Sequence, residues 1–393
     1  MTAAPLTRVA ATLRVAATEA EREAAIGAWL QAPRAAAAAG GRVIIAEGVL
    51  FDRAGPQGVP IIGLAAGCPC CTGSVALRVA LGRTLRSTRP EAVLLLLQTA
   101  EHLPRLRRIL EYGELGVRFE VEDSVEQARV NGIDIAYRLD GDGAPTRPWL
   151  VFAHALGHDH TMWDAQVEAF GRGCNILRYD LRGHGRSDAP PGDYTLEQMT
   201  DDLRELLDHL AIRRCHFIGL SLGAMIGQLA ALRAPLRIAS LTLAGAACRF
   251  SPQMQPLWAG RIAAVRSALG MDAIIDATIS GWFTAAFFAT RAADVARSVQ
   301  VLRRTPVDGY IGAIAAMSRA DLSTRLSAVA CPVLVVAGAD DRVVPFSYAE
   351  QILLHLHHAR LQRIAGAAHL SNIEQAADFN AALREFLAGE SSP

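Results

Sequence analysis

Short apolar runs recur along the last two thirds of the chain, and segments with helical periodicity separate most of them. Runs this short and this apolar indicate buried strands. Strands that alternate with helices indicate an α/β fold with a mainly parallel sheet covered on both faces. The runs are WLVFAH (149–154), CNILRYD (174–180), CHFIGL (215–220), IASLTLAG (238–245), PVLVVAG (332–338) and LQRIAG (361–366), and the helical patterns lie at 196–210, 222–233 and 373–388.

Two departures from this rhythm shape the same part of the chain. VNGIDIAYRL has the Asn-Gly pair and the alternation of a strand entering a hairpin, which suggests where the sheet begins. Between about residues 248 and 330 the strand pattern disappears and the sequence has helical periodicity throughout. We therefore expect a helical cap inserted over the sheet.

The first 120 residues or so predict a smaller α/β unit. Its expected strands are 42–48, 59–67 and 92–99, and its expected helices are 75–87 and 103–113. FEVEDSVEQARV (119–130) is acidic and poor in apolar bulk, which indicates a boundary. The predicted domains are residues 1–123 and 124–393.

Composition excludes several classes of protein. Hydrophobic residues make up 51% of the 393 residues and charged residues 20%, which predicts a packed core rather than disorder. Basic and acidic residues number 39 each, so no global field would recruit nucleic acid or an anionic membrane. The start of the chain has no continuous apolar core, and the uncharged stretch 54–77 is interrupted by glycines and prolines. We expect a cytoplasmic protein without a membrane partner.

The motif GLSLG (219–223) directly follows the apolar strand CHFI and precedes a helical pattern. A serine on a sharp turn between a strand and a helix needs glycine two residues before and after it, because side chains there would clash. The turn would expose the Ser221 hydroxyl at the end of the sheet. Ser221 is the candidate nucleophile.

A serine hydroxyl needs an adjacent base, and the base needs an orienting acid. GAAHLSNIEQ presents His369 in a loop before the last helix, and VLVVAGADDRVVP ends a strand with two carboxylates. The order serine, acid, histidine along the chain is that of an α/β-hydrolase. Asp341 fits the expected spacing before the proline of DRVVP and is preferred over its neighbour Asp340.

The oxyanion that forms during such an attack needs preorganised N–H donors. We expect these to be the backbone N–H groups of Leu222, directly after the nucleophile, and of Leu156, in the loop HALGHD. His154, His158 and His160 in and after this loop lack a fourth metal ligand, so loop architecture explains them better than a metal site.

Together, GLSLG, DLRGHGRSD, GADDRVVP and AAHLSNIEQ resemble the α/β-hydrolase family over about residues 126–390. The cap segments 258–287 and 305–322 resemble the 3-oxoadipate enol-lactonases, hydrolases of the β-ketoadipate pathway of aromatic catabolism. The chain departs from that pattern at Ala155, where the family often has a small polar residue. It also lacks the proline that often follows the Glu-Gln pair near its end.

This resemblance implies a serine esterase that opens a small carboxylate-bearing enol-lactone to 3-oxoadipate through an acyl-enzyme, with no cofactor for catalysis. The free carboxylate of such a substrate needs a cation, and a guanidinium suits it. Arg261 is the candidate, with Trp258, Trp282 and Tyr310 as an apolar wall. A solvated arginine and a cap core made of these aromatic residues are the alternative interpretation.

Other functions remain open at this point. The same triad could serve a broader carboxylesterase or a hydrolase that cleaves a C–C bond next to a ketone, since the cap pocket decides between them. The sequence gives no indication of the oligomeric state.

GCPCCTG (67–73) supports a hypothesis of a different class. It resembles the Cys-x-Cys-Cys segment of CobW-type metallochaperone GTPases, although the motif G-x-x-x-x-G-K-[ST] is absent from the chain. The resemblance implies that Cys68, Cys70 and Cys71 are candidate thiolate ligands for Zn²⁺ or Cu⁺. A structural remnant without metal or redox function is the alternative.

Overall fold

The computed structural model describes residues 8–15, 18–31, 42–47, 53–54, 59–64, 92–97, 118–122, 125–141, 144–356 and 358–389. The chain divides into two compact units, residues 1–124 and 125–393. The predicted helices at 75–87 and 103–113 lie outside the described residues. Within the described ranges, no helix combines the length and apolar character that a membrane span requires.

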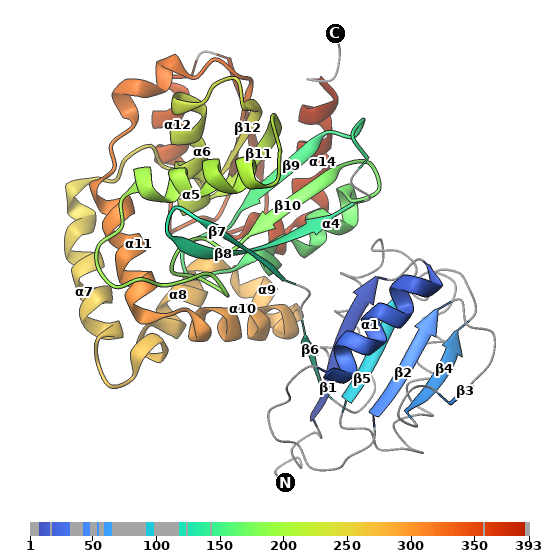
Figure 1. The fold of residues 1–393 in the computed structure, drawn as a ribbon. Coiled ribbons are helices and arrows are strands. Elements are labelled where there is room, and N and C mark those ends of the chain that lie inside the picture. Colours follow the sequence, from blue (N-terminus) through green and yellow to red (C-terminus); the bar gives the residue numbers. More distant parts are fainter. Residues whose placement is uncertain are drawn as a thin grey trace. The chain divides into compact units, whose positions relative to one another are not determined.

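Among its described residues, the first unit contains a six-stranded sheet with the strand order β3-β4-β2-β5-β1-β6 (Figure 1). Every pair in it is parallel except β3 with β4. Ile26 and Trp29 of α1 pack on buried aliphatic residues of β2 and β5, and Trp29 Nε1 donates to Thr12 Oγ1 at 3.1 Å. The elements are β1 (Arg8–Val15), α1 (Glu19–Gln31), β2 (Arg42–Glu47), β3 (Arg53–Ala54), β4 (Pro60–Leu64), β5 (Ala92–Leu97) and β6 (Arg118–Glu122).

Four elements of the first unit were not expected from the sequence: β1, α1, the two-residue strand β3, and β6. β1 and α1 are rich in alanine, which gives weak periodicity, yet Ala11 and Thr12 of β1 are buried. β6 begins one residue before the acidic segment 119–130 and otherwise lies within it. Among the described strands it pairs only with β1, at the edge of the sheet. An edge strand with alternating charges carries little apolar signal in its sequence.

The second unit is built on an eight-stranded sheet with the order β14-β13-β12-β11-β9-β10-β8-β7. The pairs β7 with β8 and β8 with β10 are antiparallel, and all others are parallel. This architecture confirms the predicted fold class, a mainly parallel sheet with helices and a helical cap. The strands are β7 (Glu126–Val130), β8 (Ile133–Asp140), β9 (Trp149–Ala153), β10 (Asn175–Tyr179), β11 (Cys215–Leu220), β12 (Ile238–Ala244), β13 (Val333–Gly338) and β14 (Ala359–Ile364).

Alternate residues of the central strands face two separate cores. Val151, Phe217 and Val335 pack in the core that contains the buried residues of α5, α6 and α12. Phe152 and Ile218 pack in the opposite core, with α4, α14 and much of the cap. The helices outside the cap are α4 (Asp164–Phe170), α5 (Leu196–His209), α6 (Leu222–Arg233), α12 (Phe346–Leu353), α13 (Ser371–Glu374) and α14 (Ala376–Gly389).

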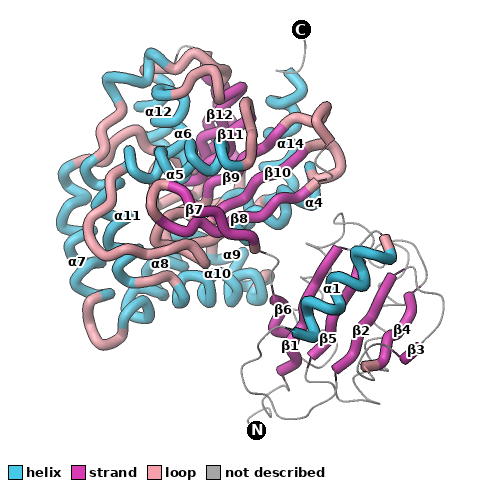
Figure 2. Tube along the Cα trace, in the orientation of Figure 1, coloured by secondary structure: helices cyan, strands magenta, loops and turns pink. Residues whose placement is uncertain are grey.

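The cap connects β12 to β13 and contains only helices and loops (Figure 2). The glycines of its last helix, α11, allow a close approach to the body of the unit, because a Cβ added at Gly309 would lie 2.0 Å from the carbonyl oxygen of Gly183. This contact fixes α11 against the loop that follows β10. The cap helices are α7 (Gln255–Val265), α8 (Ile275–Trp282), α9 (Ala285–Thr290), α10 (Ala292–Arg304) and α11 (Val307–Arg319).

A buried ion network joins the sheet to the cap. The guanidinium of Arg178 on β10 donates to Asp140 Oδ2 at 2.9 Å and to Asp164 Oδ1 at 2.6 Å, and Arg297 of α10 donates to the other oxygen of Asp164. Burial alone would lower the pKa of Arg178, but the two carboxylates raise it. Arg178 therefore stays charged inside the protein.

Replacing Arg178 with Met should destabilise the second unit strongly, because Asp140 and Asp164 would remain buried without their shared cation. Loss of one member of a buried ion network costs about 3–5 kcal/mol in the free energy of unfolding. Urea unfolding followed by circular dichroism measures this difference. Arg319→Met is the matched control, since Arg319 pairs with Asp193 on the surface. The control should cost less than about 1 kcal/mol, and equal losses in both variants would contradict a special stabilising role of the buried ion network.

Candidate active site

Ser221 occupies a sharp turn between β11 and α6. Its φ is 55° and its ψ −110°, a conformation that non-glycine residues rarely adopt. The flanking glycines permit the turn: a Cβ at Gly219 would lie 2.3 Å from the Gly223 carbonyl oxygen, and one at Gly223 would lie 2.2 Å from that of Ala153. These distances are the physical reason for glycine on both sides of the serine.

His369 and Asp341 form a buried pair after the ends of β14 and β13. His369 Nδ1 lies 2.8 Å from Asp341 Oδ2, and Asp341 Oδ1 accepts the backbone N–H groups of Val343 and Val344 at 2.8 and 2.9 Å. Asp340 is exposed, and its backbone N–H donates to Ala367. The structure thus places Asp341 beside His369, and it places the side chain of Asp340 in solvent. With Nδ1 donating to Asp341, the Nε2 lone pair of His369 can accept a proton.

The end of β12 connects the serine turn to the histidine. The Ser221 N–H donates to the Ala244 carbonyl at 2.9 Å. The next residue, Gly245, has φ 48°, and a Cβ there would lie 3.0 Å from both Cε1 and Nδ1 of His369. Gly245 therefore lets the imidazole pack against the strand end to which Ser221 is bonded. Gly245 is a site residue that was not predicted, because its only signal in the sequence is a glycine directly after a buried strand.

The expected oxyanion donors lie at the same edge of the sheet. Leu222 is the first residue of α6, whose first N–H groups have no acceptor within the helix. Leu156 lies in the loop after β9, and its N–H makes no backbone hydrogen bond to another described residue. The contact between Gly223 and Ala153, the last residue of β9, holds the start of α6 against this loop. Two backbone donors beside the serine suit an anionic tetrahedral intermediate.

The loop with Leu156 is fixed by its backbone, although Ala155 lacks the polar side chain often found at that position. The Ala155 N–H donates to Met162 Sδ at 3.4 Å, and its carbonyl accepts the His158 N–H at 3.2 Å. His154 Nδ1 lies 2.8 Å from the same carbonyl. The departure at Ala155 is therefore compensated by sulfur, backbone and imidazole contacts.

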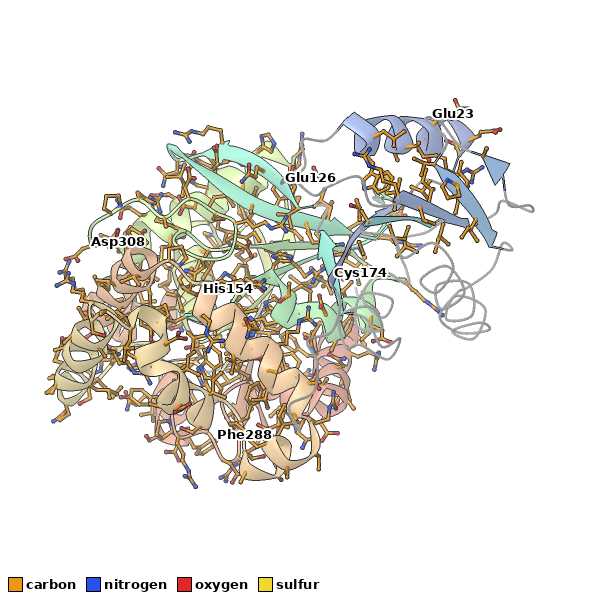
Figure 3. The ribbon with its side chains drawn as sticks, turned by 90° about the horizontal axis from the view of Figure 1, so that it is seen from below. Glu23, Glu126, His154, Cys174, Phe288 and Asp308 are labelled. Carbon is orange, nitrogen blue, oxygen red and sulfur yellow. The ribbon has the colours of Figure 1, made fainter. Side chains whose placement is uncertain are left out.

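The histidines around this loop serve as structural hydrogen-bonding groups. Both ring nitrogens of His154 are occupied, because Nδ1 contacts Ala155 and Nε2 accepts the Leu181 N–H at 2.8 Å. His160 Nδ1 lies 2.7 Å from Asp180. Figure 3 shows His154 in the interior of the second unit. No group of three or more His, Cys, Asp or Glu residues in the described ranges could hold a metal ion.

The cap residues expected to bind substrate are placed differently from one another. Trp282 and Tyr310 face the loop after β9 that carries Leu156, called the oxyanion loop below. A Cβ at Gly157 of this loop would lie 3.7 Å from Trp282 Cη2 and 3.4 Å from Tyr310 Cε2. Trp258 instead packs edge-on against Phe250, with 5.1 Å between ring centroids. The structure therefore places Trp282 and Tyr310 against the loop after β9, and Trp258 against Phe250 in a buried cluster that the cap shares with the sheet.

A hydrogen bond to Tyr310 connects Arg261 to the aromatic residues that face the oxyanion loop. Its Nη1 donates to the Tyr310 hydroxyl and to Thr278 Oγ1, both at 3.0 Å. Arg261 is half-buried, and no acidic side chain in the described residues pairs with it. Burial raises the pKa of Tyr310, although Arg261 acts in the opposite direction. Tyr310 is therefore a neutral hydroxyl group between the cation and the loop.

Cys68, Cys70 and Cys71 lie outside the described residues. The metal site suggested for them stays a prediction.

The buried histidines make stability depend on pH. Burial lowers the pKa of His154 and His158, and it lowers that of His184 to about 4. The folded protein thus keeps them neutral at pH values where the unfolded chain, with histidine pKa values of about 6.5, takes up protons. The free energy of unfolding should fall as the pH drops below about 6.5, by about 1.4 kcal/mol per pH unit for each such histidine.

Urea unfolding at several pH values between 7.5 and 4.5 measures this slope. His184 Nδ1 lies 3.1 Å from the Arg182 carbonyl, and the amide of His184→Asn can donate to the same acceptor. The variant should decrease the slope of the free energy of unfolding against pH by about 1.4 kcal/mol per pH unit, which is the contribution of one proton. An unchanged slope would show that His184 does not titrate on unfolding.

Comparison with known proteins agrees with this geometry. A family model described as the alpha/beta hydrolase fold matches residues 148–376. The chain is 32% identical to 3-oxoadipate enol-lactonase 2 of Acinetobacter baylyi over 250 residues, which cover 64% of this chain and 92% of that protein. It is also 32% identical to the putative carbamate hydrolase RutD of Variovorax paradoxus over 248 residues, 62% of this chain and 93% of that protein.

Among solved structures, the enol-lactonase from Burkholderia xenovorans LB400 superimposes with a TM-score of 0.64. It is 36% identical, and the match covers 67% of this chain and 100% of that structure. The matched family model spans more than half of the chain and includes the positions of Ser221, Asp341 and His369. The chain belongs to the alpha/beta hydrolase fold family.

Proposed function

We propose that the protein is a serine hydrolase that opens 3-oxoadipate enol-lactone, or a closely similar carboxylate-bearing enol-lactone, to the corresponding keto acid. The observation that carries the substrate class is the position of Arg261. Among the described residues, its guanidinium donates only to hydroxyl groups, and one of them belongs to Tyr310, whose ring lies against the oxyanion loop. Enol-lactonases among the similar proteins support the same class.

In the first half of the proposed reaction, the Ser221 hydroxyl attacks the lactone carbonyl and His369 Nε2 takes its proton. Asp341 holds Nδ1 and stabilises the imidazolium. The carbonyl oxygen becomes an oxyanion between the N–H groups of Leu156 and Leu222. The ring C–O bond then breaks. The enolate oxygen takes the proton from His369, and the resulting enol tautomerises to the ketone.

In the second half, water attacks the acyl carbonyl while His369 accepts a proton from it. The tetrahedral intermediate collapses, its C–O bond to Ser221 breaks, and His369 returns the proton to the serine oxygen. The product leaves with two carboxyl groups and one keto group. The residues of the site supply every proton transfer, so this chemistry requires no cofactor.

The carboxylate of the substrate would supply an anionic hydrogen-bond acceptor for the guanidinium of Arg261. A guanidinium presents five donors, and the hydrogen bonds of Arg261 to described residues use only Nη1. A carboxylate can accept two parallel N–H groups from such a fork. Anchoring the far end of the substrate at Arg261 would direct its lactone carbonyl toward Ser221.

Other hydrolase reactions use the same triad, and one relative is named a putative carbamate hydrolase. A broader carboxylesterase and a C–C bond hydrolase are also compatible with the fold. These alternatives differ from the proposal in their substrates. Turnover of the enol-lactone, of a short p-nitrophenyl ester, of a carbamate and of a vinylogous diketone compares them directly.

Hydrolysis of the enol-lactone by the wild-type protein, followed by its ultraviolet absorbance, tests the function itself. Ser221→Ala should lower kcat by about 10⁴-fold or more, because the variant has no nucleophile. A wild-type protein that hydrolyses the carbamate or the neutral ester in preference to the lactone would contradict the substrate proposal. Activity that survives in Ser221→Ala would contradict the serine mechanism.

Arg261→Ala tests the carboxylate anchor. The kcat/KM for the enol-lactone should fall about 10- to 100-fold, which corresponds to the loss of a charge-assisted contact. The kcat/KM for a neutral p-nitrophenyl ester should change much less. Arg266→Ala is the matched control, because Arg266 is exposed at the end of the same helix. Equal losses on the lactone and the neutral ester would refute the anchor.

A further inference from the structure

Glu374 is a buried carboxylate close to the active site that the proposed reaction does not use. It ends the short helix α13, five residues after His369, and only 6% of its surface is exposed. Buried carboxylates are uncommon unless they are paired or fully hydrogen-bonded. The contacts of Glu374 therefore need an explanation.

Three donors from two separate segments converge on this carboxylate. Oε2 accepts the backbone N–H of Ala368 at 2.8 Å, and Oε1 accepts the backbone N–H of Thr284 at 3.0 Å. The Thr284 hydroxyl also donates to Oε1. No cationic side chain in the described part of the second unit forms an ion pair with Glu374, so N–H and O–H groups alone stabilise its charge.

Thr284 belongs to the cap, where its side chain caps α9. Its Oγ1 accepts the Phe287 N–H at 3.3 Å and donates its own proton to Glu374. Two residues earlier, the Trp282 carbonyl accepts the Leu370 N–H at 3.1 Å. The cap segment with Trp282 and Thr284 is thus bonded at two points to the chain that carries His369, through Glu374 and through Leu370.

The bond between Ala368 and Glu374 and the bond between Leu370 and Trp282 lie on either side of His369. The N–H before it, from Ala368, is held by Glu374, and the N–H after it, from Leu370, is held by Trp282. On the far side of the loop, the Ala367 carbonyl accepts the Asp340 N–H at 2.9 Å. The backbone that carries the imidazole is therefore fixed from the cap and from the end of β13 together.

An amide could not replace the carboxylate here. Both oxygens of Glu374 face backbone N–H groups, and the two orientations of a glutamine each point its NH₂ group at one of them. One donor would then face another donor, and a buried N–H would lose its acceptor.

We infer that Glu374 is a positioning residue. It holds the backbone of His369 at a fixed position relative to Trp282, which lines the proposed substrate site. It acts through the loop backbone and touches neither substrate nor nucleophile. The inference rests on the proposed role of His369 as the base. It predicts that the chemical step, rather than substrate binding, depends on the contact between Glu374 and Thr284.

Four variants of the full chain test this: Glu374→Gln, Thr284→Val, the double variant, and Glu385→Gln as control. Glu385 is exposed on α14 and undergoes the same chemical change. Hydrolysis of p-nitrophenyl acetate gives kcat and KM. Titration of the active serine with a fluorophosphonate corrects kcat for misfolded protein, so that a loss of folded enzyme does not count as a loss of rate.

Glu374→Gln should lower the corrected kcat about tenfold and leave KM within about twofold, while Glu385→Gln should change neither. Thr284→Val should lower kcat less, because its backbone N–H remains. In the double variant, Thr284→Val should add little to the effect of Glu374→Gln, since both disrupt one contact.

A normal corrected kcat in Glu374→Gln, or losses that add fully in the double variant, would overturn the inference. If Glu374→Gln does not fold, Thr284→Val alone decides: an unchanged kcat in that variant overturns it. Failure of the proposed serine mechanism is recognised separately, because Ser221→Ala would then retain activity toward the same ester.

Discussion

The backbone at Ser221 is held in a conformation that a serine does not adopt on its own. A φ of 55° in a non-glycine residue costs of order 1–3 kcal/mol, and packing around it must offset that cost. The hydrogen bond from the Ser221 N–H to Ala244, and the close contacts of Gly219 and Gly223 with neighbouring backbone, hold the turn in this arrangement. The same turn directs the serine out of the sheet and starts α6, whose first N–H groups face the site.

This constraint explains why much of the site could be predicted from sequence. The glycines around the serine, the order of the three residues and their positions after buried strands are all local features, and the structure brings Asp341 and His369 within 2.8 Å. The choice of Asp341 over Asp340 has a physical basis as well. Only Asp341 accepts the N–H groups of the turn that follows it, which orients its other oxygen toward the histidine.

The features that sequence could not provide depend on contacts between distant segments. Nothing local indicates that Asp164 would join Arg178 of β10 to Arg297 of the cap, or that Glu374 would bond to Thr284, 90 residues earlier. Trp258 and Trp282 carry the same signal in the sequence, and nothing in it indicates that Trp282 would lie against Gly157 and Trp258 against Phe250. In the first unit, β6 escaped prediction because an edge strand needs few apolar residues.

The hydrogen-bond partners of the buried and half-buried arginines bear on the proposed class of substrate. Arg178 is neutralised by two aspartates, and Arg182 donates to both oxygens of Asp202 at 2.8 and 2.6 Å. Arg261 is partly withdrawn from water too, but its partners among the described residues are hydroxyl groups, which carry no compensating charge. A cation in such surroundings gains more from an arriving anion than one already paired. Since the triad and the oxyanion donors are common to hydrolases of many specificities, the proposal of a substrate with a free carboxylate rests on this cation in the cap.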